Sequence, residues 1–176
     1  MLRLPAAAIV GIAAGVFMTV RAQSPVNSRQ EAQLRQLFPS ATSFAPKGGD
    51  PPHFKAFAND PRTGSPVLAG LAFWTTELAP LERGYDGPIK ILVGLDTSGM
   101  LAGVIVTEHH EPYGYFSVDL PEFPRQFKGK NIRDPFRVGE DIDAVSRATL
   151  TVRSAARAVK DSARRVARQL LTPPSQ

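Results

Sequence analysis

The chain of 176 residues contains no cysteine, and this absence excludes several kinds of chemistry at once. Structural disulfides, thiolate metal sites, iron–sulfur clusters, a thiol nucleophile and a lipidated N-terminal cysteine all need that side chain. The redox compartment must therefore be inferred from the N-terminus rather than from the cysteines. Hydrophobic residues make up 43% of the chain and charged residues 21%, which suits one ordinary core and is not typical of disordered or fibrous proteins.

Signatures of hydrolases and of nucleic-acid binding are missing as well. The chain has three histidines and many carboxylates, but neither a G-x-S-x-G elbow nor an H-E-x-x-H pair. The formal net charge is +5, yet residues 152–168 alone carry six Arg or Lys side chains against Asp161, so the excess positive charge is concentrated in one segment. No basic stripe interleaved with aromatic residues is present, and we therefore expect no nucleic-acid partner.

The N-terminal segment is typical of an export signal. Arg3 precedes an uncharged apolar run at residues 4–20, and the sequence VRA follows before Gln23. This pattern favours cleavage after Ala22. The alternative is that residues 1–22 remain as a single membrane anchor, although the run is short for a span of about 20 apolar residues. Either outcome places the folded part in the periplasm, or anchored to the inner membrane and facing the periplasm.

The spacing of apolar and turn-forming residues predicts an α+β domain. A capping box of Ser28 and Glu31 predicts a helix that ends at Pro39, so that residues 23–45 form an N-terminal helix and linker. Strands are expected at residues 67–75, 89–95 and 100–107, with a weaker one at 53–57. Because no helix separates the later strands and residues 96–99 form a hairpin turn, the sheet is expected to be antiparallel.

The main domain, which we place at residues 46–172, is expected to end in a long amphipathic helix packed on the sheet. Residues 111–138 contain four prolines and no sustained period, as functional loops often do, although Phe123 and Phe127 are expected to face inward from a short helix. The final helix begins near Thr151, and its apolar residues are small, which favours packing under a sheet over insertion at a membrane surface. Residues 173–176 are expected to be a tail.

A compact polar sequence before this helix resembles a flavin-attachment motif. Residues 143–149, DAVSRAT, are similar to the D-x-x-[ST]-G-A-T-[ST] motif of the FMN-binding domain family. LFPSATSF (37–44), GYDGPIKILVGLD (84–96) and EHHEP (108–112) look like further landmarks of that family in the same order. The resemblance covers residues 34–170. It is closest to the exported domain of the nitrous oxide reductase maturation protein, a relative of flavin subunits of the Rnf and sodium-pumping quinone reductase complexes.

The resemblance implies that Thr149 carries FMN through a phosphoester to its hydroxyl. A threonine hydroxyl is not nucleophilic unaided, so the resemblance also implies a partner, an FAD-dependent FMN transferase. Asp143 and Ser146 would be recognised by that enzyme or would position Thr149. Ala148 matches the alanine of the family motif.

The sequence departs from the motif at two positions. Arg147 replaces the usual glycine, and it would be strained if the position requires a positive φ. Leu150 follows the attachment residue where Ser or Thr is common, so the final threonine of the motif is shifted to Thr151.

The residues themselves leave two interpretations of the threonines open. A Thr149 hydroxyl at a helix entrance would hold a phosphate against free amides and the positive end of the helix dipole, and Arg147 or Arg153 could add charge-assisted hydrogen bonds. In the alternative, Thr149 or Thr151 merely caps the helix. The four landmarks in order favour the first interpretation.

Other candidate residues lie at strand ends. His109, His110 and Glu111 invite a metal hypothesis, but adjacent residues at a strand end point to opposite faces, so we expect no metal site. They could instead bond a strand end to the following loop, or the resemblance places them beside the flavin, where a histidine could tune its potential. Tyr113 and Tyr115 in the next loop could contact the flavin or serve ordinary packing.

Gly84 and Tyr85 read as a turn that feeds a strand, and the resemblance implies that this turn packs near the flavin. Trp74 and Thr75 end a strand that we place on the same rim. Burial of Trp74 in the core is favoured over stacking on the ring.

Together these features predict an exported flavoprotein that acts as an electron-transfer module between a membrane redox partner and an acceptor. The expectation is an electron carrier rather than a self-sufficient enzyme, since no substrate pocket or acid–base pair is apparent. The alternative is a non-catalytic assembly or sensing module of a respiratory or metalloenzyme maturation system that binds FMN non-covalently.

Overall fold

The computed structural model describes residues 26–171. The predicted signal or anchor at residues 1–22 and the tail at 173–176 lie outside the described residues. Within the described part of the chain, no helix combines the length and apolar character needed to cross a membrane.

A five-stranded sheet forms the centre of the domain, and its strands lie side by side in sequence order. They are β1 (Ser43–Phe44), β2 (Phe54–Asn59), β3 (Pro66–Trp74), β4 (Lys90–Asp96) and β5 (Leu101–Glu108). Every neighbouring pair is antiparallel, which confirms the predicted sheet. The predicted hairpin turn at residues 96–99 joins β4 to β5. The expectation that no helix separates the later strands is wrong between β3 and β4, where the connection contains the short helix α2 (Thr75–Leu78).

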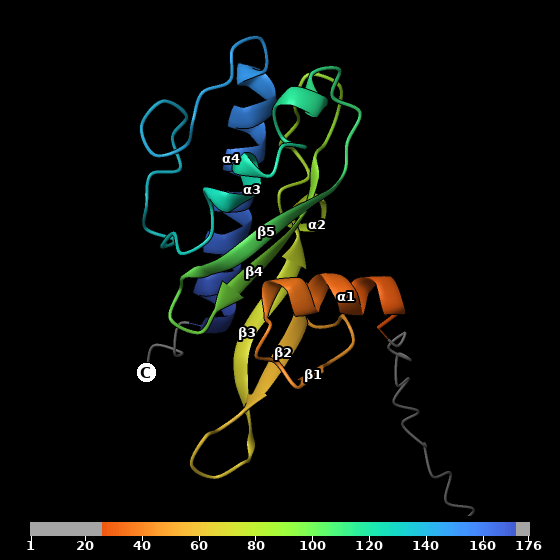
Figure 1. Ribbon diagram of the computed structural model, residues 1–176, viewed down its shortest axis with the longest axis vertical. Coiled ribbons are helices and arrows are strands. Elements are labelled where there is room, and N and C mark those ends of the chain that lie inside the picture. The colour runs from red at the N-terminus through yellow and green to blue at the C-terminus, as the bar shows by residue number, and fades with distance from the viewer. Residues whose placement is uncertain (1–25, 172–176) are drawn as a thin grey trace, which may run out of the picture.

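Two long helices cover opposite faces of this sheet, α1 (Ser28–Leu37) on one side and α4 (Thr149–Val166) on the other (Figure 1). Shorter helical turns are α2 (Thr75–Leu78), α3 (Glu122–Arg125) and η1 (Gly114–Phe116), and a π-helical turn, η2 (Ala167–Leu171), extends α4. The α+β class with an N-terminal and a C-terminal helix is thereby confirmed.

The predicted cap of α1 is wrong by one residue. Asn27 is the N-cap, and its side chain accepts a hydrogen bond from the Gln30 amide at 2.9 Å. The Gln30 side chain in turn accepts from the Asn27 amide, so the capping box is formed by these two residues and not by Ser28 and Glu31. Both pairs have the right spacing, and sequence alone did not separate them.

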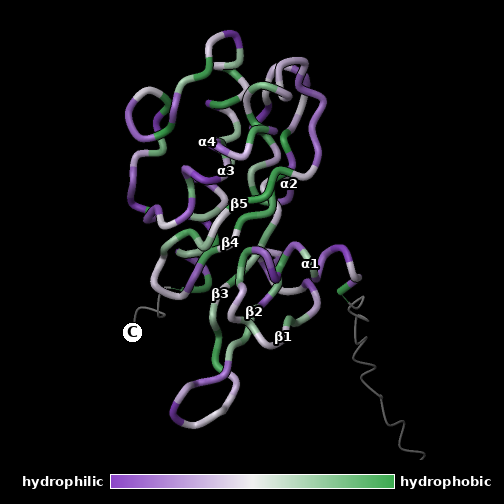
Figure 2. Tube along the Cα trace, viewed as in Figure 1, coloured by the Kyte–Doolittle hydropathy of each residue, from purple (hydrophilic) through white to green (hydrophobic). Residues whose placement is uncertain are grey.

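Alternation along β3 separates the two cores. Leu71 and Phe73 point to the α4 side, whereas Ala72 and Trp74 point to the α1 side. In Figure 2 the hydrophobic colour follows the central strands, and the loop joining β2 to β3 is hydrophilic. The α4 core contains Phe123 and Phe127, with ring centroids 5.1 Å apart, which confirms that both face inward. The position of α4 relative to the sheet is therefore fixed by a large apolar contact.

Candidate cofactor site

The helix α4 begins at Thr149, two residues earlier than its sequence predicted. Its N-cap is Ala148, and no side chain caps the helix, so the interpretation of Thr149 or Thr151 as a cap is wrong. The first intrahelical bond in this turn runs from the Val152 amide to the Ala148 carbonyl at 3.0 Å. The amides that precede Val152 stand at the positive end of the helix dipole without intrahelical acceptors.

Thr149 lies at this helix mouth in a partly open position. Its side chain is half-buried, and its Oγ1 donates a hydrogen bond to the Val145 carbonyl at 3.2 Å. Asp143, Ser146 and Leu150 around it are exposed, and Leu150 exposes 50% of its surface. The hydroxyl is therefore outside the apolar interior and is approachable from solvent.

Arg147 adopts the backbone conformation that favours glycine. Its φ is +67°, in the left-handed region, where an L-residue with a Cβ is strained by about 1–2 kcal/mol. The sequence suggested that arginine would be strained here if the position required a positive φ, and the position does have a positive φ. Ala148 after it is buried, so the chain turns sharply from solvent into the core before α4 begins.

Glu111 is the centre of a hydrogen-bond network beside this turn. Its side chain is only 6% exposed, and its carboxylate accepts from the Tyr85 amide at 2.9 Å and from the Asp86 amide at 2.8 Å. The same carboxylate accepts from the hydroxyl of Thr151, in the first turn of α4. One buried carboxylate therefore joins the 84–86 turn to the helix that carries Thr149, and these bonds to a charged acceptor are stronger than neutral ones.

Gly84 has a steric reason to lack a side chain. A Cβ at this position would lie 2.5 Å from the Glu111 Cδ, well inside van der Waals contact. The Gly84 amide donates to the Gly87 carbonyl at 2.7 Å and closes the turn. Close backbone approach at Gly84, expected from the sequence, is thus an approach to Glu111.

His109 extends the network away from α4. Its Nδ1 accepts from the Glu111 amide at 3.1 Å, which leaves Nε2 as the ring nitrogen that donates to Asp119, at 2.7 Å. A Cβ at Gly114 would lie 2.9 Å from Nε2, so the loop packs tightly against the ring. His110, by contrast, is exposed. His109 therefore has the predicted role of bonding a strand end to its loop.

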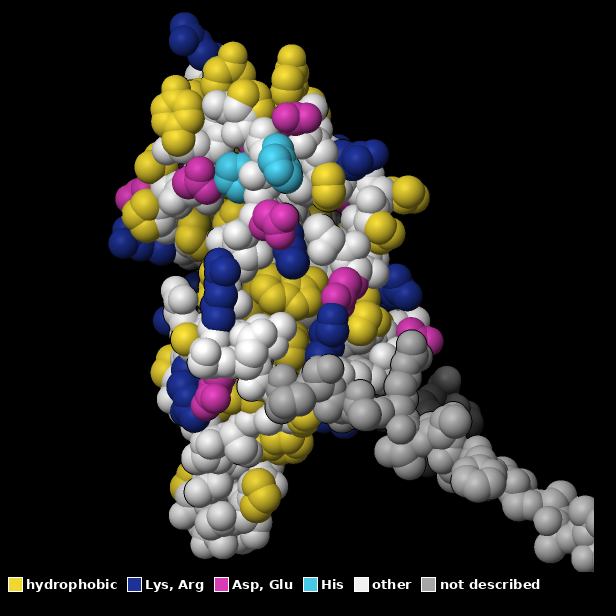
Figure 3. Space-filling view, turned by 90° about the vertical axis from the view of Figure 1, so that its right-hand side faces the viewer, with side chains coloured by type: hydrophobic (Ala, Val, Ile, Leu, Met, Phe, Trp, Pro, Cys, Tyr) yellow, Lys and Arg dark blue, Asp and Glu magenta, His cyan; other side chains and the backbone are white. Residues whose placement is uncertain are grey.

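The histidine side chains lie among acidic ones on the face drawn in Figure 3, with hydrophobic side chains gathered above them. Within residues 26–171, no group of three or more His, Cys, Asp or Glu side chains is arranged to hold a metal ion.

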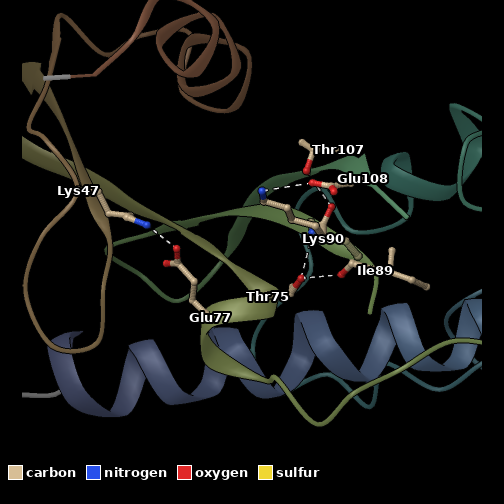
Figure 4. A network of polar contacts seen from close by, with 8 residues as sticks. Lys47, Thr75, Glu77, Ile89, Lys90, Thr107 and Glu108 are labelled. Carbon is tan, nitrogen blue, oxygen red and sulfur yellow. Dashed lines mark hydrogen bonds and ion pairs between the residues drawn. The ribbon is translucent and has the colours of Figure 1, made fainter. Parts of the chain in front are cut away.

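Trp74 is not brought together with Thr149. Trp74 is 7% exposed and lies in the α1 core, on the opposite side of the sheet from α4, with Lys90 Nζ 5.2 Å from its ring centroid. The buried Thr75 hydroxyl donates to the Ile89 carbonyl and accepts from the Ile91 amide, both at 3.0 Å (Figure 4). Both residues therefore support β4 from the end of β3.

The segments joined by Glu111 also carry exposed apolar side chains. Tyr85 exposes 71% of its surface, and Tyr113, Tyr115 and Leu150 are exposed as well. The Tyr115 ring meets Phe116 edge to face with centroids 4.8 Å apart, so this loop has an ordered aromatic surface.

Sequence reasoning missed Asp86, Asp119 and Gly114, each of which completes the network. Asp86 contributes only its backbone amide, and Asp119 pairs with a histidine ten residues earlier. No residue type or spacing marked these contacts, although the glycine between two tyrosines could have signalled a close approach.

Known proteins resemble this chain in the same region that contains the Glu111 network and Thr149. A family profile described as FMN-binding domain matches residues 84–164, a range that begins at Gly84 and contains Glu111 and Thr149. The chain is also similar to the G subunit of the ion-translocating oxidoreductase complex of Photorhabdus laumondii, with 34% identity over 126 residues that cover 66% of this chain and 56% of that protein.

The corresponding proteins of other bacteria, which carry the same name, show the same similarity. The Escherichia coli K12 protein is 37% identical over 92 residues, which cover 47% of this chain and 45% of that protein. The Pectobacterium atrosepticum protein is 33% identical over 126 residues, 66% of this chain and 56% of that protein. The chain spans about half the length of the curated relatives it matches.

Proposed function

Because residues 84–164 belong to the FMN-binding domain family, related to the flavin subunits of Rnf complexes, we propose that this chain is an exported flavoprotein with FMN esterified to Thr149. It carries electrons between a membrane redox partner and an acceptor. The observation that carries the proposal is the half-buried Thr149 hydroxyl at the mouth of α4, held outside the apolar core.

The residues around Thr149 fit a phosphoester. The first-turn amides and the helix dipole favour a negative phosphate at this position, and the exposed guanidinium group of Arg147 supplies positive charge nearby. Esterification removes the hydroxyl proton, so the bond from Thr149 to the Val145 carbonyl is lost, at a cost of about 1 kcal/mol. Phosphate contacts to the amides offset that loss.

Attachment needs a second protein. The Thr149 hydroxyl donates to the Val145 backbone carbonyl and not to a side-chain base, so the proposal includes an FAD-dependent FMN transferase that takes the hydroxyl proton. The hydroxyl oxygen forms the new bond to the FMN phosphorus, the pyrophosphate bond of FAD breaks, and AMP leaves. Asp143 and Ser146 are exposed on the approach to Thr149, where such an enzyme can read them.

The network centred on Glu111 has a positioning role in this proposal. It fixes the 84–86 turn and the loop after β5 against the first turn of α4, and it brings the exposed Tyr85 and Leu150 to the same end of the domain. These apolar side chains offer contact surface to a flat ring system. Bound FMN would supply one- or two-electron redox chemistry there.

The location and partners follow from the same reasoning. The export-type segment at residues 1–22 favours a periplasmic or inner-membrane-anchored domain. The names of the relatives, subunits of an ion-translocating oxidoreductase complex, favour a membrane redox protein as electron donor or acceptor. The closer resemblance to the nitrous oxide reductase maturation branch stays a prediction.

Intact-mass measurement of the chain produced together with the transferase tests the proposal. The mass is expected to rise by one FMN less one water, Thr149→Ser to keep the increase and Thr149→Ala to abolish it. An increase that persists in Thr149→Ala and disappears in Thr151→Val would move the attachment to Thr151. A bare-chain mass, with yellow colour lost on denaturation, would replace the covalent proposal with the non-covalent assembly or sensing module.

Electron transfer is tested separately with the flavinylated chain. A quinone-linked membrane reductant is expected to bleach the flavin absorbance under anaerobic conditions. A flavin that no such reductant bleaches would contradict the role of electron carrier while leaving the attachment intact.

A further inference from the structure

A groove of about 290 Å³ lies between α4 and the loop that precedes it, and the site network does not use it. Its loop wall is formed by Phe136, Arg137, Val138 and Glu140, and its helix wall by Arg153, Arg157 and Lys160. The loop and the N-terminal half of α4 run side by side in Figure 1. Phe136 and Val138 make its floor apolar, whereas its rim is strongly basic.

The basic side chains on the helix wall share one face. Arg153, Arg157 and Lys160 follow each other at spacings of four and three residues, so they line up along one side of α4. Arg157 pairs with Glu82 at 3.0 Å, but the side chains of Arg153 and Lys160 make no ion pair or hydrogen bond with any residue between 26 and 171. Opposite them, Arg137 pairs with Glu140 at 3.1 Å. Two cations of the groove are therefore free to bind an anionic partner.

The loop wall is held rigidly. The Asp141 carboxylate accepts from the Phe136 amide at 3.0 Å, from the Arg137 amide at 2.6 Å and from Lys130 Nζ at 2.9 Å. Arg164 of α4 ties the start of the loop by donating to the Ile132 and Asp134 carbonyls. A groove whose walls are already ordered costs less conformational entropy when a ligand binds.

We propose that this groove is a docking surface for an acidic segment of the protein with which the domain exchanges electrons. The segment places carboxylates against Arg153 and Lys160 and apolar side chains over Phe136 and Val138. This inference rests on the proposed function, since it names the chemistry of the redox partner.

Two observations favour an acidic protein segment. The surface is concave with an apolar floor, so it suits an extended chain better than a flat bilayer. The groove also starts close to the attachment residue, because Arg153 lies four residues after Thr149, about 6 Å along the helix axis. A partner bound there lies beside the tethered flavin, and complementary charge speeds its association.

A fluorescent glutamate-rich peptide that contains leucine is the probe, and a peptide with glutamine in place of glutamate is its neutral control. Anisotropy titrations use the flavinylated full chain, the variant Arg153→Glu/Lys160→Glu, and the control Lys55→Glu/Arg62→Glu. The control changes the net charge equally at exposed positions of β2 and the β2–β3 loop. Binding of the same proteins to vesicles containing phosphatidylglycerol is measured in parallel. Intact mass gives the FMN content of each protein.

The parent and the control are expected to bind the glutamate peptide with equal affinity, and the groove variant roughly tenfold more weakly, because two exposed ion pairs are lost and two repulsions are added. Equal binding by both variants would overturn the proposal, and so would vesicle binding that depends on the groove while peptide binding does not. If the variants carry FMN and bind the peptide equally, the docking proposal is contradicted and the proposed function is unaffected. A parent chain that acquires no FMN contradicts the proposed function, whatever the peptide does.

Discussion

The bond between the Thr151 hydroxyl and the Glu111 carboxylate permits a direct test of the network at the helix mouth. Both side chains are buried, and the bond crosses 40 residues of sequence. A hydrogen bond to a charged acceptor contributes about 1.5–3 kcal/mol. Thr151→Val preserves the shape of the side chain and removes the donor, so it is expected to lower the free energy of unfolding by about 2 kcal/mol.

Glu111→Gln perturbs the same bond from the other side. The amide keeps one acceptor oxygen but loses the charge, and its NH₂ group meets a backbone donor where a carboxylate oxygen stood. With two backbone amides and one hydroxyl affected, we expect a loss of about 2–3 kcal/mol. In the double variant the shared bond is removed only once, so the two effects should overlap by about 1–2 kcal/mol.

Urea titrations followed by circular dichroism, with all four proteins compared at one pH, measure this coupling energy. If the effects of Thr151→Val and Glu111→Gln add to within about 0.5 kcal/mol, the two side chains do not share a bond and the derived network is incorrect. An unchanged dependence on denaturant is required for the comparison, because a change in slope would indicate an altered unfolded or native state.

Four further predictions concern single positions. Ser162→Ala removes a buried hydroxyl that has no hydrogen-bond partner among residues 26–171, so it should leave the stability unchanged or raise it by up to about 1 kcal/mol in the same titrations. Arg147→Gly should stabilise by about 1 kcal/mol because it relieves the positive φ, and a loss of stability would contradict the left-handed conformation. Gly84→Ala should lower the melting temperature by several degrees and reduce FMN loading, since the added methyl displaces Glu111. Asp141→Asn should flatten the acid limb of the pH–stability profile, which an unchanged limb would refute.

The sign of the Asp141 effect follows from its environment. Burial alone would raise the pKa of this carboxyl, but hydrogen bonds from Lys130, Arg137 and Phe136 outweigh it and hold the pKa below its ordinary value of 3.8. The folded state therefore binds the proton less readily than the unfolded state. The stabilisation is fully present above about pH 4 and is lost as the pH falls through the lowered pKa.

The sheet was predictable from sequence because its strands combine apolar runs with turn residues, and because no helix interrupts residues 89–107. Helix ends were less predictable. Asn27 and Ser28 are both good caps, and α4 begins after Ala148, a residue type that gives no capping signal. Capping preferences predict a helix end poorly where tertiary contacts decide it, and here the burial of Ala148 and Thr151 does so.

The candidate site was predicted in its parts and not in its connections. The 84–86 turn, the 108–112 segment and the motif at 143–149 all stood out, but the sequence did not show that Glu111 joins them, because its partners lie 25 to 40 residues away. For Trp74, the position expected from the sequence was wrong. It was placed on the same rim as Thr149, yet strand alternation directs it to the other side of the sheet.

The strict sequence order of the strands has a consequence for when Thr149, the proposed attachment residue, becomes available. Each hairpin can close through neighbours along the chain, whereas the helix mouth is complete only when α4 has docked against Glu111, 40 residues before Thr151. A modifying enzyme that requires the finished helix entrance would therefore act on folded domains and pass over nascent ones. Attachment of the flavin would then serve as a mark of successful folding.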